Sequence, residues 1–182
     1  MASGRVTSGG ILADVVEVRV LGPDDWVMWR ELRLAALADA PGAFGSRLAD
    51  WQGDGDREQR WRARLDIPGS LNVVAVLAGQ PAGMASGVPA ADGAAELISM
   101  WVRPAARGRG VGDRLVGAVE QWARQARAGV LRLAVARGNP AAFALYQRNG
   151  FTLTGELGDL MTDGVRRELI MTKTISVTVG YE

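Results

Sequence analysis

The amino-acid sequence predicts a single α/β domain, and three observations support that prediction. Its 182 residues fit one domain, because single domains most often run to roughly 100–150 residues. Strand-like and helix-like segments alternate along the chain without long repeats or low-complexity stretches. Near the middle, an apolar strand leads through a glycine-rich loop into an amphipathic helix. We expect residues 15–182 to form the domain and residues 1–14 to precede it as a disordered lead-in.

Composition narrows the chemistry that the chain can perform. With 48% apolar residues, 23% charged residues and a formal net charge of +1, it resembles an ordinary globular protein without bulk attraction to nucleic acid or membranes. The absence of cysteine and histidine excludes disulfides, thiolate nucleophiles, imidazole bases and Cys/His zinc sites, and we expect no metal. The apolar stretch 71–79 is far shorter than the ~20 residues that span a bilayer, and a cytoplasmic location is expected.

The first half of the chain is divided by glycine and proline into segments with clear preferences. Alternating β-branched residues predict strands, and stretches rich in Leu, Ala, Arg and Glu predict helices. Asp24 or Asp25 caps the first helix, and Pro41-Gly42 ends it. The expected elements are a strand at 15–21, helices at 26–39 and 56–65 with a loop at 43–55 between them, a hairpin of strands at 71–78 and 82–88, and a strand at 95–102.

The second half begins with a helix, because apolar residues recur at spacings of four, four and three from Val111 to Trp122. Asn139 followed by Pro140 predicts a capped helix start, and Gly150 lies where a terminating glycine belongs. The remaining expected elements are a strand at 131–136, a helix at 141–148, strands at 151–155 and 167–174, and a loop at 158–164.

The segment Arg103–Gly112 is typical of an anion-binding loop. Its three closely spaced glycines let the backbone approach a ligand, and the helix that follows adds the positive end of its dipole. Arg107 and Arg109 bring further positive charge, so a phosphate or pyrophosphate suits the loop. A plain glycine-rich turn with solvated arginines, or contact with nucleic-acid phosphates, is the alternative. Neither the Walker pattern nor the Rossmann pattern is present.

Three segments carry a resemblance to a known family. Residues 107–112 read R-x-x-G-x-G, which resembles the R/Q-x-x-G-x-G/A signature of the GNAT N-acetyltransferase superfamily. Residues 139–146, followed by Asn-Gly-Phe at 149–151, are similar to the family's N-x-x-A-x-x-x-Y and G-F pattern. Residues 34–44 resemble the first helix and loop of many bacterial members. The resemblance covers about residues 15–174.

The resemblance implies both a fold and a cofactor. The fold is a mixed sheet of six or seven strands, splayed between the fourth and fifth strands and flanked by about four helices. Acetyl-coenzyme A would lie in that opening, with its pyrophosphate on the loop amides and its pantetheine arm along the last strand residues. Asn139 would cap its helix, contact the cofactor, or do both. The implied cofactor-binding residues are Met100, Trp101, Val102, Arg107, Gly108, Arg109, Gly110, Val111, Gly112, Asn139 and Tyr146.

The implied activity is transfer of an acetyl group from acetyl-coenzyme A to a primary amine. Amide formation requires a neutral amine and a proton for the departing thiolate. Tyr146 is the candidate acid, with a core-packing tyrosine as the alternative. Glu96 is the candidate base, with a surface charge at a strand edge, or an ordered water in its place, as alternatives. We expect direct attack in a ternary complex, because no cysteine and no histidine-activated serine is available.

The acceptor site is expected at 38–54 and 158–166, whose acidic residues would attract a cationic amine. The acceptor could be a small molecule, an antibiotic, a peptide N-terminus or a lysine, and homodimer formation stays open. A non-catalytic acyl-coenzyme A sensor is the alternative function, although such a protein would need neither Glu96 nor Tyr146. Near-neutral charge and few aromatic residues argue against a nucleic-acid partner.

Overall fold

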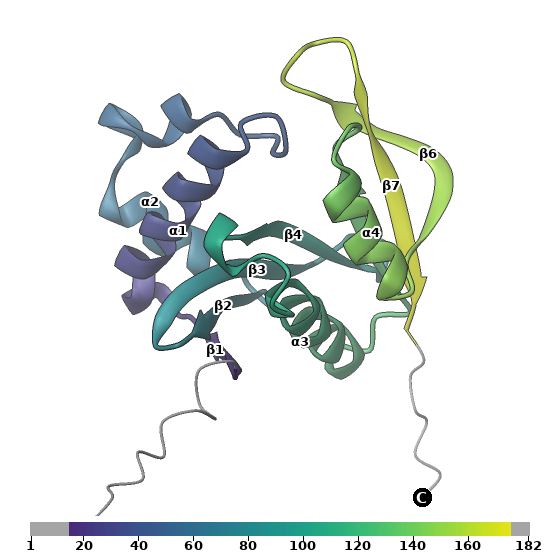
Figure 1. Ribbon diagram of the computed structural model, residues 1–182, viewed down its shortest axis with the longest axis horizontal. Helices are drawn as coiled ribbons and strands as arrows, with labels where there is room; N and C mark the ends of the chain where they lie inside the picture. Colours follow the sequence, from purple (N-terminus) through teal and green to yellow (C-terminus); the bar gives the residue numbers. More distant parts are fainter. Residues whose placement is uncertain (1–14, 176–182) are drawn as a thin grey trace, which may run out of the picture.

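A computed structural model describes residues 15–175, so the expected lead-in at 1–14 lies outside the described residues. Seven strands form one mixed sheet in the order β1-β2-β3-β4-β5-β7-β6 (Figure 1). The strands are β1 (Val16–Val20), β2 (Leu71–Leu77), β3 (Gln80–Pro89), β4 (Ala95–Val102), β5 (Val130–Val135), β6 (Thr152–Leu160) and β7 (Arg167–Thr174). The helices are α1 (Trp26–Asp39), α2 (Glu58–Leu65), α3 (Val111–Gln125) and α4 (Pro140–Arg148). The predicted α/β class, the strand number and the four helices are confirmed.

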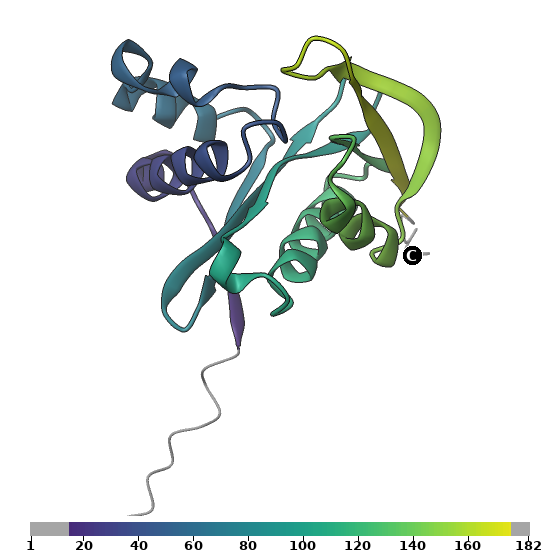
Figure 2. The same ribbon diagram turned by 45° about the horizontal axis from the view of Figure 1, so that its top comes forward.

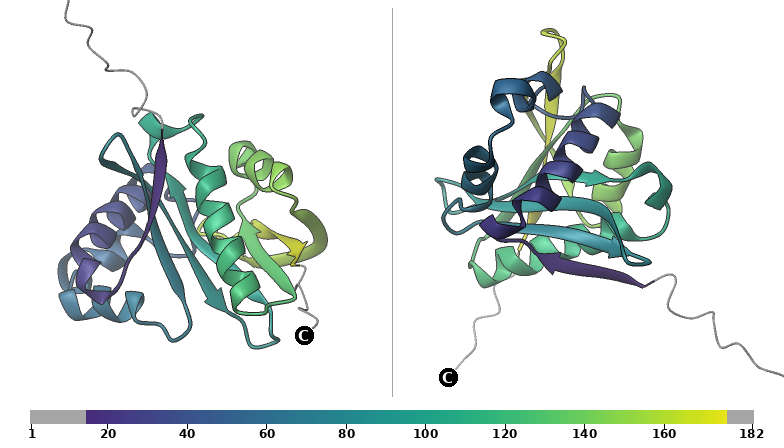
Figure 3. Two further views of the ribbon diagram at one scale, coloured as in Figure 1. Left: turned by 90° about the horizontal axis from the view of Figure 1, so that it is seen from below. Right: turned by 90° about the vertical axis from the view of Figure 1, so that its left-hand side faces the viewer.

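The helices cover both faces of the sheet. Figures 2 and 3 show α1 and α2 on one face, with α3 and α4 on the other. The α1–α2 side buries a core that includes Trp29, Leu32 and Trp61. The α3 side buries a second core that includes Leu115 and Leu131. Two cores follow from the sequence, because strands β2 and β3 are apolar on both faces and need cover on each.

The sheet opens between β4 and β5. These parallel strands pair only at Ala95 with Leu131 and at Glu96 with Arg132. On its other edge β5 pairs with β7 along its whole length, and β6 and β7 run at a steep angle to β3 and β4 (Figure 1). Ser99 has a φ of 55° at an irregularity in the β3–β4 register, and this bulge twists β4 where the strands separate. The predicted splay between the fourth and fifth strands is confirmed.

Three details differ from the sequence expectation. β6 continues to Leu160 instead of ending at Gly155, because Gly155 adopts a φ of 83° and the register with β7 shifts there without ending the pairing. α2 begins at Glu58, since the carboxylate of Asp56 accepts from Arg30 of α1 and from Trp61. The segment 43–55, expected as a loop, contains short 3-10 helices at Leu48–Trp51 and Gly53–Gly55.

Candidate active site

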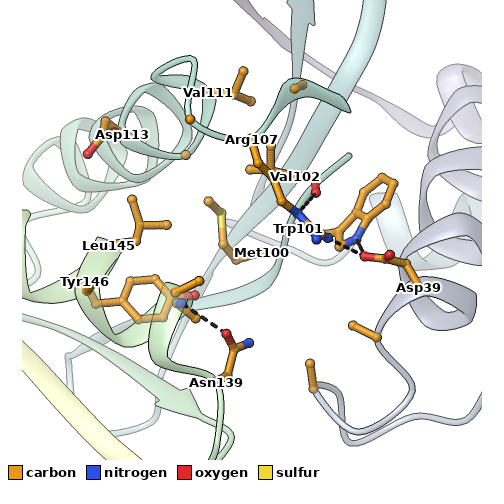
Figure 4. Close-up of a pocket in the computed structure, with 18 of the residues that line it drawn as sticks. Asp39, Met100, Trp101, Val102, Arg107, Val111, Asp113, Asn139, Leu145 and Tyr146 are labelled. Carbon is orange, nitrogen blue, oxygen red and sulfur yellow. Dashed lines mark hydrogen bonds and ion pairs between the residues drawn. The ribbon is translucent and has the colours of Figure 1, made fainter. Parts of the chain in front are cut away.

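A cleft of about 740 Å³ lies where β4 and β5 separate. Its walls come from the end of α1, the end of β4, the start of α3 and the inward side of α4. In Figure 4, Met100 lies between Tyr146 of α4 and the group formed by Asp39, Trp101 and Arg107. The volume falls within the ~300–1,000 Å³ range of ligand pockets.

The loop before α3 forms an anion cradle. Gly108 and Gly110 have φ values of 73° and 77°, in the left-handed region that glycine adopts without strain. Arg114 is the first residue of α3 whose amide bonds back to the helix, at 3.2 Å from the Gly110 carbonyl oxygen. The three preceding amides therefore have no intrahelical acceptor. At Gly112 an added Cβ would lie 3.0 Å from Leu145 Cδ2, so a larger residue there would require Leu145 to shift. The cradle fits the pyrophosphate of coenzyme A.

Arg107 is oriented by protein groups. Its Nε donates to the Val102 carbonyl oxygen at 3.1 Å, and its Nη2 donates to the Asp39 carboxylate. Trp101 Nε1 donates to the same carboxylate at 2.9 Å, and these bonds, that of Trp101 first, lower the pKa of Asp39. These two bonds hold the Arg107 guanidinium beside the loop, and the backbone amides and the helix dipole add to the attraction for phosphate.

All but one of the other residues predicted to bind the cofactor line the cleft. Met100, Trp101, Val102 and Asn139 line the cleft, as do Gly108, Gly110, Val111 and Gly112 of the cradle. Arg109 lines a shallower pocket beside β1 instead. The sequence left open which of Trp101 and Val102 faces which side of the sheet. Trp101 packs into the α1–α2 core, and Val102 packs against the α3 core.

Tyr146 reaches the cleft from α4. Only 6% of the residue is exposed, and its ring packs edge-on against Phe151 with centroids 5.9 Å apart. Burial raises the pKa of its hydroxyl, which therefore stays protonated through the neutral range. Asn139 Oδ1 accepts from the Ala142 amide at 3.1 Å and also lines the cleft, so it caps α4 and faces the cofactor space (Figure 4).

Glu96 lies near the closed end of the opening and is absent from the cleft wall. Its Oε1 accepts from Arg132 Nη2 at 2.8 Å and from Arg132 Nε at 3.2 Å. Its neighbours Ala95 and Leu97 point into the α3 core, so strand alternation directs Glu96 to the face that α1 and α2 cover. Its expected role as a base stays a prediction.

Sequence reasoning missed an ion pair that joins α3 to α4. Asp113 accepts from Arg148 at 2.7 and 2.8 Å and from Asn149 Nδ2 at 2.8 Å. An acid in the first turn of α3 was visible in the sequence, although its partners 35 and 36 residues away were not. The pair holds the two helices on either side of the cradle.

Of the two segments expected to form the acceptor site, only the first reaches the cleft. Asp39, Ala40, Ala43 and Phe44 line it. Residues 158–166 form the end of β6 and the turn into β7, and they contribute nothing to its wall. The reason is the length of β6, which carries the turn beyond the cleft.

Residues 15–175 contain neither a membrane-spanning helix nor a cluster of metal ligands. No helix there has both the length and the apolar character to cross a membrane. No group of three or more acidic, histidine or cysteine side chains in the same residues is placed to hold a metal ion.

Comparisons with known proteins agree with this geometry. The model of the acetyltransferase (GNAT) family matches residues 29–151. The L-methionine sulfoximine/L-methionine sulfone acetyltransferase of Pseudomonas paraeruginosa is 32% identical over 148 residues, which are 71% of this chain and 84% of that protein.

Solved structures show the same fold. The structure of yncA from Salmonella typhimurium with its cofactor acetyl-CoA superposes with a TM-score of 0.72 at 20% identity, covering 92% of this chain and 98% of that one. The ribosomal-protein-alanine N-acetyltransferase of Brucella melitensis is 28% identical, with a TM-score of 0.66 over 87% of this chain and 99% of that one. This chain therefore belongs to the GNAT family of acetyltransferases and is an acetyl-coenzyme A-dependent N-acetyltransferase.

Proposed function

We propose that the enzyme transfers acetyl directly from acetyl-coenzyme A to the primary amine of a small molecule, with both substrates bound at once. The observation that carries this proposal is the single cleft that has the anion cradle, Tyr146 and the α1 end in its wall. A chain without cysteine or histidine has no evident nucleophile for an acetyl-enzyme. The amine must therefore reach the thioester itself.

The pantetheine arm would extend along β4. Beyond Glu96 this strand has no strand partner on its β5 side, so its outward amides and carbonyls, apart from the Val102 carbonyl that accepts from Arg107, would be available to an extended, amide-bearing ligand. Pairing of this kind would place the acetyl group near Met100, between the α1 end and α4. This part of the cleft would then hold the reacting atoms.

Tyr146 would supply the proton for the leaving thiolate. Attack by the amine forms the new C–N bond, and collapse of the tetrahedral intermediate breaks the C–S bond. The thiolate needs a proton at that moment, and a buried, protonated phenol in the cleft wall can donate one. A role of this kind distinguishes the enzyme from a non-catalytic sensor with the same cradle.

Glu96 would accept the proton that the ammonium group loses. Its position outside the cleft wall means that the proton would travel through water between the amine and the carboxylate. Arg132 would compete for the same oxygen, because its Nε and its Nη2 both bond to Oε1. Proton loss to bulk water is the alternative.

The acceptor can be sought among amines of known relatives. The similarity to methionine sulfoximine and methionine sulfone acetyltransferases makes these two compounds the first candidates. An aminoglycoside, an alanine-terminated peptide and a lysine peptide represent the other acceptor classes.

The test is a screen of these amines that follows release of the free coenzyme A thiol. Initial rates with the best amine, measured at varied concentrations of both substrates, should give intersecting double-reciprocal lines. Parallel lines, or acetylated protein recovered in the absence of amine, would contradict direct transfer. Absence of thiol release with every amine would contradict the proposed acceptor class.

A further inference from the structure

Two arginines lie behind the α1 side of the cleft without an acidic partner. Arg33 of α1 is 9% exposed, and its buried Nη1 has no hydrogen-bond partner. Its guanidinium lies 4.6 Å from the centre of the Phe44 ring, a contact that leaves the N–H groups free at the edge. Within residues 15–175 neither Arg33 nor Arg64 forms an ion pair.

Among the described residues Arg64 of α2 has no acidic partner, and it is held by neutral oxygens and by the Trp29 ring, whose centre lies 5.3 Å from its guanidinium carbon. Its Nη1 donates to Asn72 Oδ1 at 3.0 Å, and its Nη2 donates to Ser86 Oγ at 3.1 Å and to Ser99 Oγ at 3.3 Å. These bonds fix the guanidinium in place without offsetting its charge. Asn72 and Ser86 also bond to one another at 2.7 Å, so the oxygens form a preorganised support.

The two guanidinium groups act on each other. Burial, followed by repulsion from Arg64, lowers the pKa of Arg33 to about 10. Burial lowers the pKa of Arg64 as well. Trp29 of α1 adds another buried donor, because its Nε1 also lacks a partner. A region with two uncompensated cations and orphaned N–H donors needs an anionic acceptor, since a buried charge without a partner is strongly unfavourable.

This cluster adjoins the reacting end of the cleft. Phe44, which covers Arg33, lines the cleft directly. Ser99, which bonds to Arg64, immediately precedes Met100 of the cleft wall, and its φ of 55° belongs to the bulge in β4. Ser99 and Arg64 are both partly exposed, and they lie next to the cleft wall. The anion cradle lies at the start of α3, on the other face of the sheet from α1 and α2, so the cofactor pyrophosphate does not supply this anion.

We propose that Arg33 and Arg64 bind the carboxylate of the acceptor, which is therefore a free amino acid and not a simple amine or an amidated peptide. The inference rests on the proposed function and specifies its substrate class. Planar guanidinium groups match the two oxygens of a carboxylate. In an α-amino acid the carboxylate and the amine share one carbon, so a carboxylate beside Ser99 places the amine at β4 next to Met100.

The test compares each acceptor as a free acid and as its carboxamide. The probes are L-methionine sulfone, L-methionine and L-alanine, and thiol release gives kcat/KM for each form. The variants are Arg33→Met and Arg64→Met, with Arg62→Met as the control. Arg62 lies on the same helix as Arg64 and pairs at the surface with Asp24 and Glu58. Methionine keeps most of the arginine length, and in Arg33→Met it removes a buried unpaired charge, so we expect that variant to fold at least as stably as the wild type.

The wild type should prefer the free acid of its best probe by at least about tenfold, the size expected for losing a hydrogen bond to a charged group. Arg33→Met and Arg64→Met should lose that preference, mainly through KM, while Arg62→Met retains it. Equal rates with acid and carboxamide in the wild type would overturn the proposal. A preference that survives in Arg33→Met would overturn it as well.

A binding measurement separates this inference from the proposed function. If no probe releases thiol, the proposed transfer to these amines fails, and the carboxylate site is then judged by thermal shift. A rise in melting temperature with L-methionine sulfone that is absent with its carboxamide and absent in Arg33→Met supports the site. Equal shifts with both compounds, or no shift with either, refute it.

Discussion

Asp39 at the end of α1 forms an ion pair with Arg107 at the start of the anion cradle, across 68 positions of sequence. The same carboxylate accepts from Trp101 of β4, so one side chain joins the first helix, the splayed strand and the loop. Arg107 is thereby kept in contact with the Val102 carbonyl at the point where β4 ends. This pair therefore joins the α1 side of the cleft to the anion cradle.

Asp39→Asn should weaken acetyl-coenzyme A binding about fivefold, the effect of losing roughly 1 kcal/mol from a partly exposed ion pair. The reason is that Arg107 would no longer hold the loop in one geometry. Calorimetric titration with coenzyme A measures the change. Asp163→Asn is the matched control, because Asp163 pairs with Arg166 in the turn before β7 and does not line the cleft. Unchanged or tighter binding in Asp39→Asn would show that the pair does not support the cradle.

Gly110→Glu should abolish the rise in melting temperature that acetyl-coenzyme A produces in the wild type. A side chain at this position requires a strained φ near 77° and brings a negative charge to the cradle. Gly93→Glu is a close control, because Gly93 has a φ of 78° with equally open surroundings and lies in the β3–β4 turn. That variant should keep its thermal shift. A folded Gly110→Glu protein with the wild-type shift would refute the placement of the pyrophosphate.

Tyr146→Phe should lower kcat by roughly 10²-fold, as expected for loss of a general acid. The ring packing against Phe151 is retained in this variant, so the melting temperature and the cofactor-induced shift should change little. Because burial raises the pKa of the Tyr146 hydroxyl, the wild-type rate should not fall through ionisation of this group between neutral and mildly alkaline pH. An unchanged kcat in Tyr146→Phe would leave the residue a packing role only.

Glu96→Gln should reduce the rate at neutral pH, and the loss should be partly recovered at high pH, where more of the amine is already neutral. The pH profile of kcat/KM measures this. Arg132→Gln provides the matched comparison, because it frees the Glu96 carboxylate from its ion pair and leaves the carboxylate in place. A Glu96→Gln profile that runs parallel to that of the wild type at every pH would identify water as the proton acceptor.

Asp56→Asn should lower the melting temperature at pH 7. Asp56 joins α1 to α2 by accepting from Arg30 and from Trp61 Nε1, and these bonds, that of Arg30 first, lower its pKa to about 2. A carboxylate whose pKa is lower in the folded protein than in the unfolded chain stabilises the fold at any pH above its pKa in the unfolded chain. That stabilisation is lost as the pH falls toward about 2, the pKa in the folded protein. The difference in melting temperature between variant and wild type should therefore narrow between about pH 4 and pH 2. A difference independent of pH would assign the effect to packing.

The sequence by itself determined the features of this protein that depend on neighbouring residues. The spacing of the glycines at 108, 110 and 112, after an apolar strand and before an amphipathic helix, defines the cradle locally. Asn139 followed by Pro140 likewise defines the start of α4 within four residues. The absence of cysteine and histidine excluded whole classes of mechanism without any structure.

The tertiary structure alone decided which distant side chains meet. Asp39 and Arg107, Asp113 and Arg148, and the unpaired Arg33 and Arg64 come together through strand order, the bulge at Ser99 and the packing of α1 and α2. The spacing of apolar residues along the chain does not predict such contacts, because they depend on how separate helices and strands are placed relative to one another. A β6 strand that extends past Gly155 removed residues 158–166 from the cleft for the same reason, since strand length there is set by pairing with β7 and not by the local sequence.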